Sequence, residues 1–203
     1  GGTDALSRYA YLYQYDNRNR MIRKKLPGAG WIRYEYDRGD RLIATQNAVQ
    51  AAQSTATCSF HLYDDYNRLV VQGTCDFFGS ITSMGSSMLS TSLSYSSDGF
   101  VNPTGIGSSG YNPGISLYSS IPHTVNYYDD YKFMKLAGFT NTNFTTPTSQ
   151  NSGKGLLTGK VTTLLDGSNK KLYTAYYYDE KGRLTKTISS NHLGGYDITT
   201  TTY

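Results

Sequence analysis

The chain has 203 residues, a formal net charge of +4 and 20 tyrosines, while only 17% of its residues are charged. An aromatic fraction of 14% is too high for a disordered, highly charged chain. No apolar run approaches the ~20 residues that a membrane helix needs, so we expect no membrane span in this segment. The charge is too weakly basic to indicate nucleic acid as a partner. Leu-, Ala- and Glu-rich helical patterning is also missing, which leaves a β-rich fold as the expectation.

A motif of the form Tyr-Asp-x-x-(Gly/Asn/Asp)-Arg recurs four times. Its Asp can accept hydrogen bonds from backbone N–H groups two residues on, and its fifth position holds residue types that tolerate a positive φ. A type I turn followed by one left-handed residue is a common hairpin connection, so each copy predicts one hairpin tip. A degenerate copy occupies residues 127–134. The four good copies comprise Tyr15, Asp16, Asn19 and Arg20; Tyr36, Asp37, Asp40 and Arg41; Tyr63, Asp64, Asn67 and Arg68; and Tyr178, Asp179, Gly182 and Arg183.

The segments beside these turns alternate as strands do. Residues 156–165 and 171–178 are two strand-like runs joined by a turn signal. Only residues 44–53 look helical, and we expect a turn or two of helix there. A further strand with period-two alternation is predicted before the first turn from four tyrosines: Tyr9, Tyr11, Tyr13 and Tyr15.

The spacing of the copies indicates an insertion. The motif tyrosine advances by 21 and 27 residues between the first three copies, then by 65 to the degenerate copy and by 50 to the last. Residues 80–120 are rich in Ser and Gly and hold one charged residue, Asp98. Low complexity favours a linker, but the parity of the apolar residues favours two half-buried strands. The two parity sets are Leu89, Leu93 and Tyr95, and Ile115, Leu117 and Ile121.

We therefore expect three parts: hairpins over residues 1–78, a Ser/Gly-rich insertion with short strands over residues 79–122, and further hairpins over residues 123–203. The chain begins Gly-Gly and stops within a Thr-rich run that reads as a strand. We expect it to be a segment of a longer protein.

The two cysteines flank the third hairpin. A register with one bulged residue would place Cys58 directly opposite Cys75, within the Cα separation that a disulfide needs. Without the bulge the two side chains lie on opposite faces and remain thiols. Both alternatives, a disulfide and two packed thiols, stay open at this point.

Other candidate chemistry is weak. The adjacent carboxylates Asp64-Asp65 and Asp129-Asp130 fall inside the turn motif, where turn capping explains them better than glycoside hydrolysis or calcium binding. Histidines are scattered, and no Cys-x-x-Cys or His-x-x-x-His spacing indicates a metal. We expect no catalytic residue, no metal and no cofactor. The tyrosines Tyr9, Tyr11 and Tyr13 are a candidate ligand face, since aromatic rings on a sheet can bind carbohydrate, whereas cross-strand packing is the simpler interpretation.

The Tyr-Asp-x-x-Gly-Arg-Leu unit resembles the YD repeat of the Rhs and teneurin proteins. Residues 13–74, which include Arg-Lys-Lys-Leu-Pro-Gly and Tyr-Asp-Arg-Gly-Asp-Arg-Leu-Ile-Ala-Thr-Gln, are similar to Rhs-repeat proteins of Bacteroides-type bacteria. The resemblance covers most of residues 9–78 and 123–203. It implies an all-β wall, because such repeats coil a β-ribbon into a hollow shell that in polymorphic toxins encloses a toxic domain. The family's autoproteolytic signature has no match here, and four or five hairpins suffice for a sheet or part of a wall.

The expected fold is therefore all-β: antiparallel hairpin repeats forming a meander or part of a shell wall, with a Ser/Gly-rich insertion. The expected function is a non-catalytic structural segment of a larger secreted or surface protein, with flanking repeats of the same polypeptide as its partners. The alternative is a module that binds glycan or another surface protein through exposed tyrosines or the insertion. An enzyme ranks third.

Overall fold

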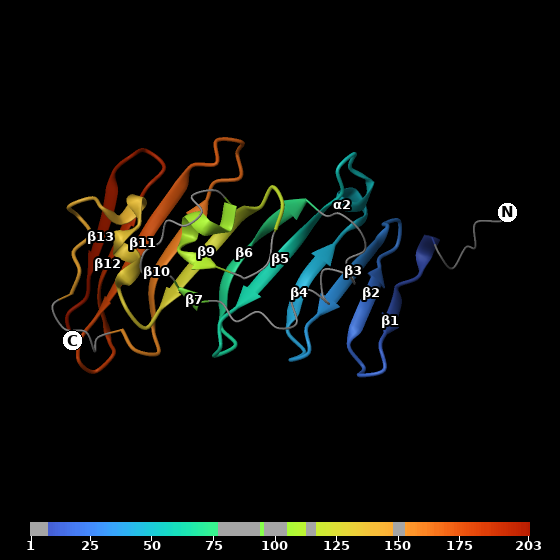
Figure 1. Cartoon of the computed structure of the whole chain (residues 1–203), viewed down its shortest axis with the longest axis horizontal. Coiled ribbons are helices and arrows are strands. Elements are labelled where there is room, and N and C mark those ends of the chain that lie inside the picture. Colours follow the sequence, from blue (N-terminus) through green and yellow to red (C-terminus); the bar gives the residue numbers. More distant parts are fainter. Residues whose placement is uncertain (1–7, 77–93, 96–104, 113–116, 148–152) are drawn as a thin grey trace.

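The computed structural model describes residues 8–76, 94–95, 105–112, 117–147 and 153–203 (Figure 1). Eleven strands form one antiparallel sheet in the order β1-β2-β3-β4-β5-β6-β9-β10-β11-β12-β13, which confirms the all-β prediction. The strands are β1 (Leu12–Tyr15), β2 (Met21–Lys25), β3 (Trp31–Tyr36), β4 (Leu42–Gln46), β5 (Thr57–Tyr63), β6 (Leu69–Asp76), β9 (Ile121–Tyr128), β10 (Leu157–Thr163), β11 (Lys171–Tyr178), β12 (Leu184–Ser190) and β13 (Tyr196–Thr200).

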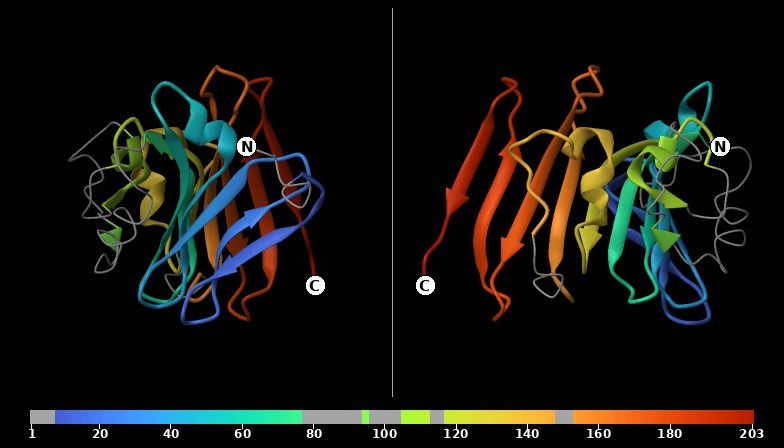
Figure 2. Two further views of the ribbon diagram at one scale, coloured as in Figure 1. Left: turned by 90° about the vertical axis from the view of Figure 1, so that its right-hand side faces the viewer. Right: turned by 60° about the vertical axis from the view of Figure 1, so that its left-hand side comes forward.

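In both long gaps between motif copies, a long stretch of sequence separates two strands that are neighbours in this sheet. Strand β6 pairs directly with β9, with Val71 opposite Val125, although residues 77–120 separate the two strands in sequence. Strand β9 in turn pairs with β10 across a second excursion, residues 129–156. The hairpins before and after the Ser/Gly-rich segment therefore belong to one continuous sheet, whose strands run side by side with a twist (Figure 2).

Short elements occupy the excursions. Strands β7 (Ser94–Tyr95) and β8 (Tyr111–Asn112) form a small two-stranded sheet, preceded at β8 by the 3-10 helix η1 (Gly105–Ser109). The second excursion holds the 3-10 helices η2 (Lys132–Lys135) and η3 (Ala137–Phe139). Of the strands expected in the insertion, Leu89, Leu93 and Ile115 lie outside the described residues, Tyr95 lies in β7, Leu117 lies in a loop and Ile121 begins β9.

The hydrophobic core lies on one face of the sheet. Facing positions on neighbouring strands, such as Leu62 on β5, Val71 on β6 and Val125 on β9, are almost fully buried. The inserted segments cover this face: Tyr127 stacks on Tyr111 from the first at 5.8 Å and on Phe133 from the second at 4.7 Å between ring centroids. Figure 2 shows residues 105–112 lying to one side of the sheet.

Gly159 allows the aromatic rings of the second excursion to pack directly on the sheet. The ring of Phe133 lies so close to β10 that a Cβ on Gly159 would come within 2.4 Å of it. Since real Cβ atoms do not approach a ring so closely, this position accepts no larger side chain unless the aromatic cluster moves.

Three local predictions need correction. The alternation from Tyr9 does not make one strand: Tyr9 lies in a helical turn, Tyr11 precedes β1, and the strand is Leu12–Tyr15. The helix α2 covers Ala48–Ala52 only, because the Asn47 side chain caps it through the Gln50 N–H, while residues 44–46 continue β4.

The degenerate motif copy is not a hairpin tip. After Asp129 the chain leaves the sheet, and it returns only at Leu156, whose carbonyl oxygen accepts a hydrogen bond from the Asp129 N–H at 3.0 Å. This bond takes the place of the one that closes the regular turns, from the Asp16 N–H to the Arg20 carbonyl oxygen at 3.0 Å. The second excursion is thus an insertion into a repeat turn.

The cysteine register is the bulged one. Cys58 lies opposite Cys75, with the register shift between Leu62 and Tyr63. Both residues are buried, and their Sγ atoms lie 3.6 Å apart as a hydrogen-bonded thiol pair, with no disulfide between them. The disulfide stays a prediction about oxidising conditions.

Candidate functional site

The four motif turns lie side by side at the same end of the strands, at the bottom of Figure 1, and each is built in the same way. In the first, Oδ1 of Asp16 accepts hydrogen bonds from the N–H groups of Arg18 at 2.9 Å and Arg20 at 3.0 Å. Its Oδ2 pairs with Nε of Arg20 at 2.7 Å. Because donors and acceptor all lie within five residues, the motif closes its own turn.

The fifth motif position is left-handed in every good copy. Its φ is 58° at Asn19, 62° at Asp40, 61° at Asn67 and 73° at Gly182. Each turn is accompanied by a shift in strand register just before the Asp, for example between Gln14 and Tyr15. This is the bulged hairpin connection that the motif predicts.

The arginines of the first two motif turns also donate hydrogen bonds to the following motif turn. Nη1 of Arg20 donates to the carbonyl oxygen of Asp37 at 3.1 Å and to Oδ1 of Asp40 at 2.8 Å. Nη1 of Arg41 in the same way contacts Oδ1 of Asn67 at 3.2 Å. The fifth position of one turn therefore receives the arginine of the turn before it.

The motif tyrosines point in the opposite direction, to the preceding turn. The Tyr36 hydroxyl donates to the carbonyl oxygen of Met21 at 3.0 Å, immediately after Arg20, and the guanidinium of Arg20 lies over the Tyr36 ring at 5.0 Å. We call these arginine and tyrosine contacts between successive turns the turn ladder. The same hydroxyl contact is made by Tyr63 to Leu42, Tyr128 to Leu69, Tyr178 to Leu157 and Tyr203 to Leu184.

Tyr203 makes both tyrosine contacts of the turn ladder. In addition to its hydrogen bond to Leu184, its ring lies under the guanidinium of Arg183 at 4.7 Å. Tyr203 has no Asp after it in this sequence, so a motif search passes over it. At the other end Tyr15 is 59% exposed, and its hydroxyl has no hydrogen bond to the described part of the chain.

In the degenerate copy, which we call the interrupted copy because the second excursion divides its turn, a different ion pair makes the contact with the preceding turn. Nη1 and Nη2 of Arg68 contact the two carboxylate oxygens of Asp129 at 3.0 and 2.6 Å. Asp129 has a φ of 73° and also accepts a hydrogen bond from the Gly155 N–H at 2.8 Å. Leu156 occupies the position at which a regular copy has its arginine. Its Cδ1 atom lies 3.6 Å from the position that a Cβ on Gly182 would take. Contact between these two turns is thus apolar rather than ionic.

Electrostatics in the ladder favours the charged forms of its acids. Backbone hydrogen bonds and the paired arginine hold the pKa of Asp16 and of Asp179 below the usual range. The bidentate contact with Arg68 lowers the pKa of Asp129 and raises that of the arginine itself. Burial raises the pKa of the phenol groups of Tyr36, Tyr63, Tyr128 and Tyr178. The carboxyls are therefore kept as charged acceptors and the phenols as protonated donors, which are the forms that the hydrogen bonds of the turn ladder need.

Two clefts lie beside the ladder. In a cleft of about 260 Å³ at the first two hairpins, burial raises the pKa of Glu35. The other carboxylate there, Asp16, is already occupied by Arg20 and two backbone N–H groups. A cleft of about 220 Å³ at the degenerate copy is lined by both carboxylate pairs of the motif turns, Asp64-Asp65 and Asp129-Asp130. Arg68 pairs with Asp64 and Asp129, and Lys132 pairs with Asp130. Within the described ranges, no three His, Cys, Asp or Glu side chains could hold a metal ion.

The candidate ligand face is exposed but is not one flat strand. Tyr9 is 76% exposed, Tyr11 63% and Tyr13 45%, and only Tyr13 belongs to β1. The Lys24 ammonium lies over the Tyr13 ring at 5.9 Å. The structure thus separates the exposed tyrosines before the first turn from four half-buried tyrosines of the ladder, which are Tyr36, Tyr63, Tyr128 and Tyr178.

Comparisons with known proteins add little. No family model matches the sequence, and no curated protein matches it. Among solved structures, the chain is similar to a chain in the crystal structure of TcdB2-TccC3-TEV, with 15% sequence identity and a TM-score of 0.26. The match covers 95% of this chain and 9% of that one, so the present chain spans about a tenth of that chain's length. In the described part of the chain, no helix has the length and apolar character required to cross a bilayer.

Proposed function

We propose that this chain is a non-catalytic wall segment of a larger secreted or surface-exposed protein of the YD-repeat type. The observation that carries the proposal is the turn ladder, in which Arg20 reaches forward to Asp40 and Tyr36 reaches back to Met21. Each hairpin both receives and supplies the same contacts, so a further hairpin with the same motif can be added at either edge. This is the property that a long, continuous β-wall requires.

The outer strands support the same proposal. Tyr15, in the outermost strand β1, carries the motif, but no arginine of the described residues covers it as Arg20 covers Tyr36 and Arg41 covers Tyr63. At the opposite edge Tyr203 already engages Arg183. The outermost strands β1 and β13 leave backbone N–H and C=O groups for a further strand, and flanking repeats of the same polypeptide would pair with them.

Binding of glycan or another surface protein is the second candidate. The exposure of Tyr9, Tyr11 and Tyr13 favours it, because flat rings with a hydrogen-bonding edge are suited to carbohydrate. The wall proposal accounts for the exposure of Tyr15 but not for that of these three residues.

One experiment separates the two candidates. An antibody raised against the chain is used to probe source cells on a denaturing gel, before and after protease treatment of intact cells. The wall proposal expects a polypeptide much larger than the 22.5 kDa of the chain and accessible at the surface or in the medium. A product of 22.5 kDa, or a large one confined inside the cells, contradicts it.

A glycan array provides the second arm. We compare the chain with a triple variant, Tyr9→Ser, Tyr11→Ser and Tyr13→Ser, and with Tyr118→Ser, a substitution at another exposed tyrosine. Hits that disappear in the triple variant but persist in the control would favour the binding module. An array without hits leaves the wall as the better account.

A further inference from the structure

A cavity away from the turn ladder lies between the sheet and both inserted segments. It has a volume of about 140 Å³ and is walled mainly by apolar side chains, including Val125 of β9, Val161 of β10 and Leu136 of the second excursion. Tyr173 of β11 closes another side, and Ser108 comes from the first insertion. Segments distant in sequence therefore form one small, partly open cavity on the core face.

A lysine reaches this apolar space. Lys171 lies opposite Thr163 at the start of β11, on the same face as Tyr173 and Ala175, and it lines the cavity. Its Nζ donates to Oγ of Ser108 at 3.0 Å. An ammonium has three donor hydrogens, and Lys171 takes part in none of the ion pairs among the described residues. Burial accordingly lowers the pKa of this amine.

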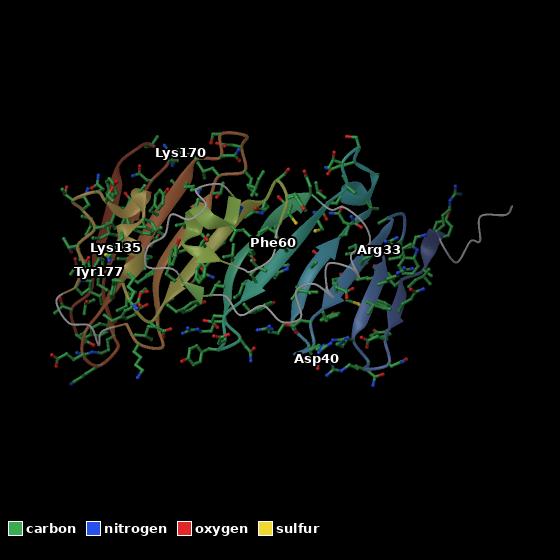
Figure 3. The ribbon with its side chains drawn as sticks, in the orientation of Figure 1. Arg33, Asp40, Phe60, Lys135, Lys170 and Tyr177 are labelled. Atoms are coloured by element: carbon green, nitrogen blue, oxygen red, sulfur yellow. The ribbon has the colours of Figure 1, made fainter. Side chains whose placement is uncertain are left out.

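The neighbouring lysine shows how unusual this placement is. Lys170 is exposed and donates to the carbonyl oxygen of His192 at 2.6 Å. In Figure 3 it lies at the end of the strands opposite to Asp40 and the motif turns. Lys171 is half-buried on the core face, so it loses part of its hydration, and an anion bound in the cavity would compensate this loss.

We propose that this cavity binds a small organic carboxylate with an apolar body about the size of a benzene ring, and that Lys171 pairs with its carboxylate group. The size follows from the volume, since a closed apolar cavity of ~150 Å³ is known to accept benzene. The charge follows from the lysine, because a charge-assisted hydrogen bond to a carboxylate is stronger than one to a neutral group. The proposal is independent of the wall function, since the cavity uses none of the ladder residues.

Benzoate is the probe, and titration calorimetry with the whole chain is the measurement. We expect saturable binding of benzoate and at least tenfold weaker binding of benzyl alcohol, which has the same ring and no charge. Lys171→Met, which keeps the apolar stem, should weaken benzoate binding at least tenfold. The matched control Lys170→Met should leave it unchanged. Absence of saturable binding, equal binding of benzyl alcohol, or full binding by Lys171→Met overturns the proposal.

Two further measurements guard against a variant that does not fold. Ala137 is an exposed residue in the cavity lining, so Ala137→Trp should close the entrance and abolish binding without changing the core. In the wild-type chain with ¹³C-labelled lysine, benzoate should shift the Cε resonance of Lys171 and not that of Lys170. A shift at Lys170 alone, or unaltered binding by Ala137→Trp, places the ligand elsewhere and overturns the assignment.

Discussion

Arg68 and Asp129 are joined by two nitrogen–oxygen contacts of 2.6 and 3.0 Å although 61 residues separate them in sequence. The pair connects the last regular turn before the insertions to the interrupted one after them. Oδ2 of Asp64 holds the same guanidinium through Nε at 2.7 Å. One arginine thus closes its own turn and fastens the two halves of the sheet at their junction.

Replacing this arginine tests the ladder as a source of stability. We expect Arg68→Leu to lower the free energy of unfolding by roughly 2 kcal/mol, since it removes charge-assisted hydrogen bonds worth about 1.5–3 kcal/mol. Solvent screening keeps the loss below that of a fully buried pair, because the Arg68 side chain is 23% exposed. Urea denaturation measures the change. Arg38→Leu, in the exposed part of a turn, is the control and should stay within about 0.5 kcal/mol; equal losses would contradict the ladder.

The left-handed turn position is tested by exchanging residue types. Gly182 has a φ of 73°, so Gly182→Val should cost roughly 1–2 kcal/mol, whereas Gly182→Asn should cost only a few tenths. At Asn67, where φ is 61°, Asn67→Gly keeps the backbone conformation and loses only the contact from Arg41, so it should cost less than Asn67→Val. Thermal unfolding monitored by circular dichroism gives the order. Indifference to valine at both sites would rule out this turn geometry.

The aromatic cover of the sheet should contribute more than any exposed side chain. Phe133 is 1% exposed and stacks on Tyr127, so Phe133→Ala is expected to cost about 3–5 kcal/mol. Leu193 is 83% exposed, and Leu193→Ala should change the stability by less than about 0.5 kcal/mol. The comparison uses chemical denaturation of both variants. A small loss for Phe133→Ala would mean that the second excursion does not pack on the sheet.

The thiol pair should be protected from reagents. Cys58 is 0% exposed and Cys75 is 2% exposed, and the hydrogen bond between them together with burial raises the pKa of Cys75. We expect a thiol reagent to label both cysteines only after unfolding, and intact mass without reductant to show two thiols. A mass lower by two hydrogens would instead establish the disulfide that the facing register allows.

The stability should fall in mild acid because of His61. Burial lowers its pKa below 6.5, and its Nδ1 has no hydrogen-bond partner among the described residues. The unfolded state then binds a proton at a higher pH than the folded state, so the free energy of unfolding decreases as pH falls from about 6.5 toward the folded pKa. The contribution is complete above that range.

Denaturation midpoints measured between pH 7.5 and 5 check this expectation. His61→Gln should reduce the pH dependence in that window without abolishing it, because burial also lowers the pKa of His123. His192→Gln, in an exposed turn segment, is the control. A wild-type profile that is already flat would show that His61 charges without cost in the fold.

What the sequence alone determined is local. The turn at Asp16 is set by an acceptor, two backbone N–H groups and a left-handed residue within five positions, so the motif predicts it without knowledge of the rest of the chain. The strand Lys171–Tyr178 was predicted with its observed bounds for the same reason, since period-two alternation is a property of the strand itself.

What only the tertiary structure decided depends on which strands become neighbours. Strand β6 pairs with β9 although residues 77–120 separate them in sequence, and this pairing brings Asp129 to Arg68. The same strand order makes the degenerate copy an interrupted turn and places Lys171 in an apolar cavity. Such contacts join residues tens of positions apart. A periodic pattern specifies that a face is buried, but the partner that buries it is chosen by the packing of the whole sheet.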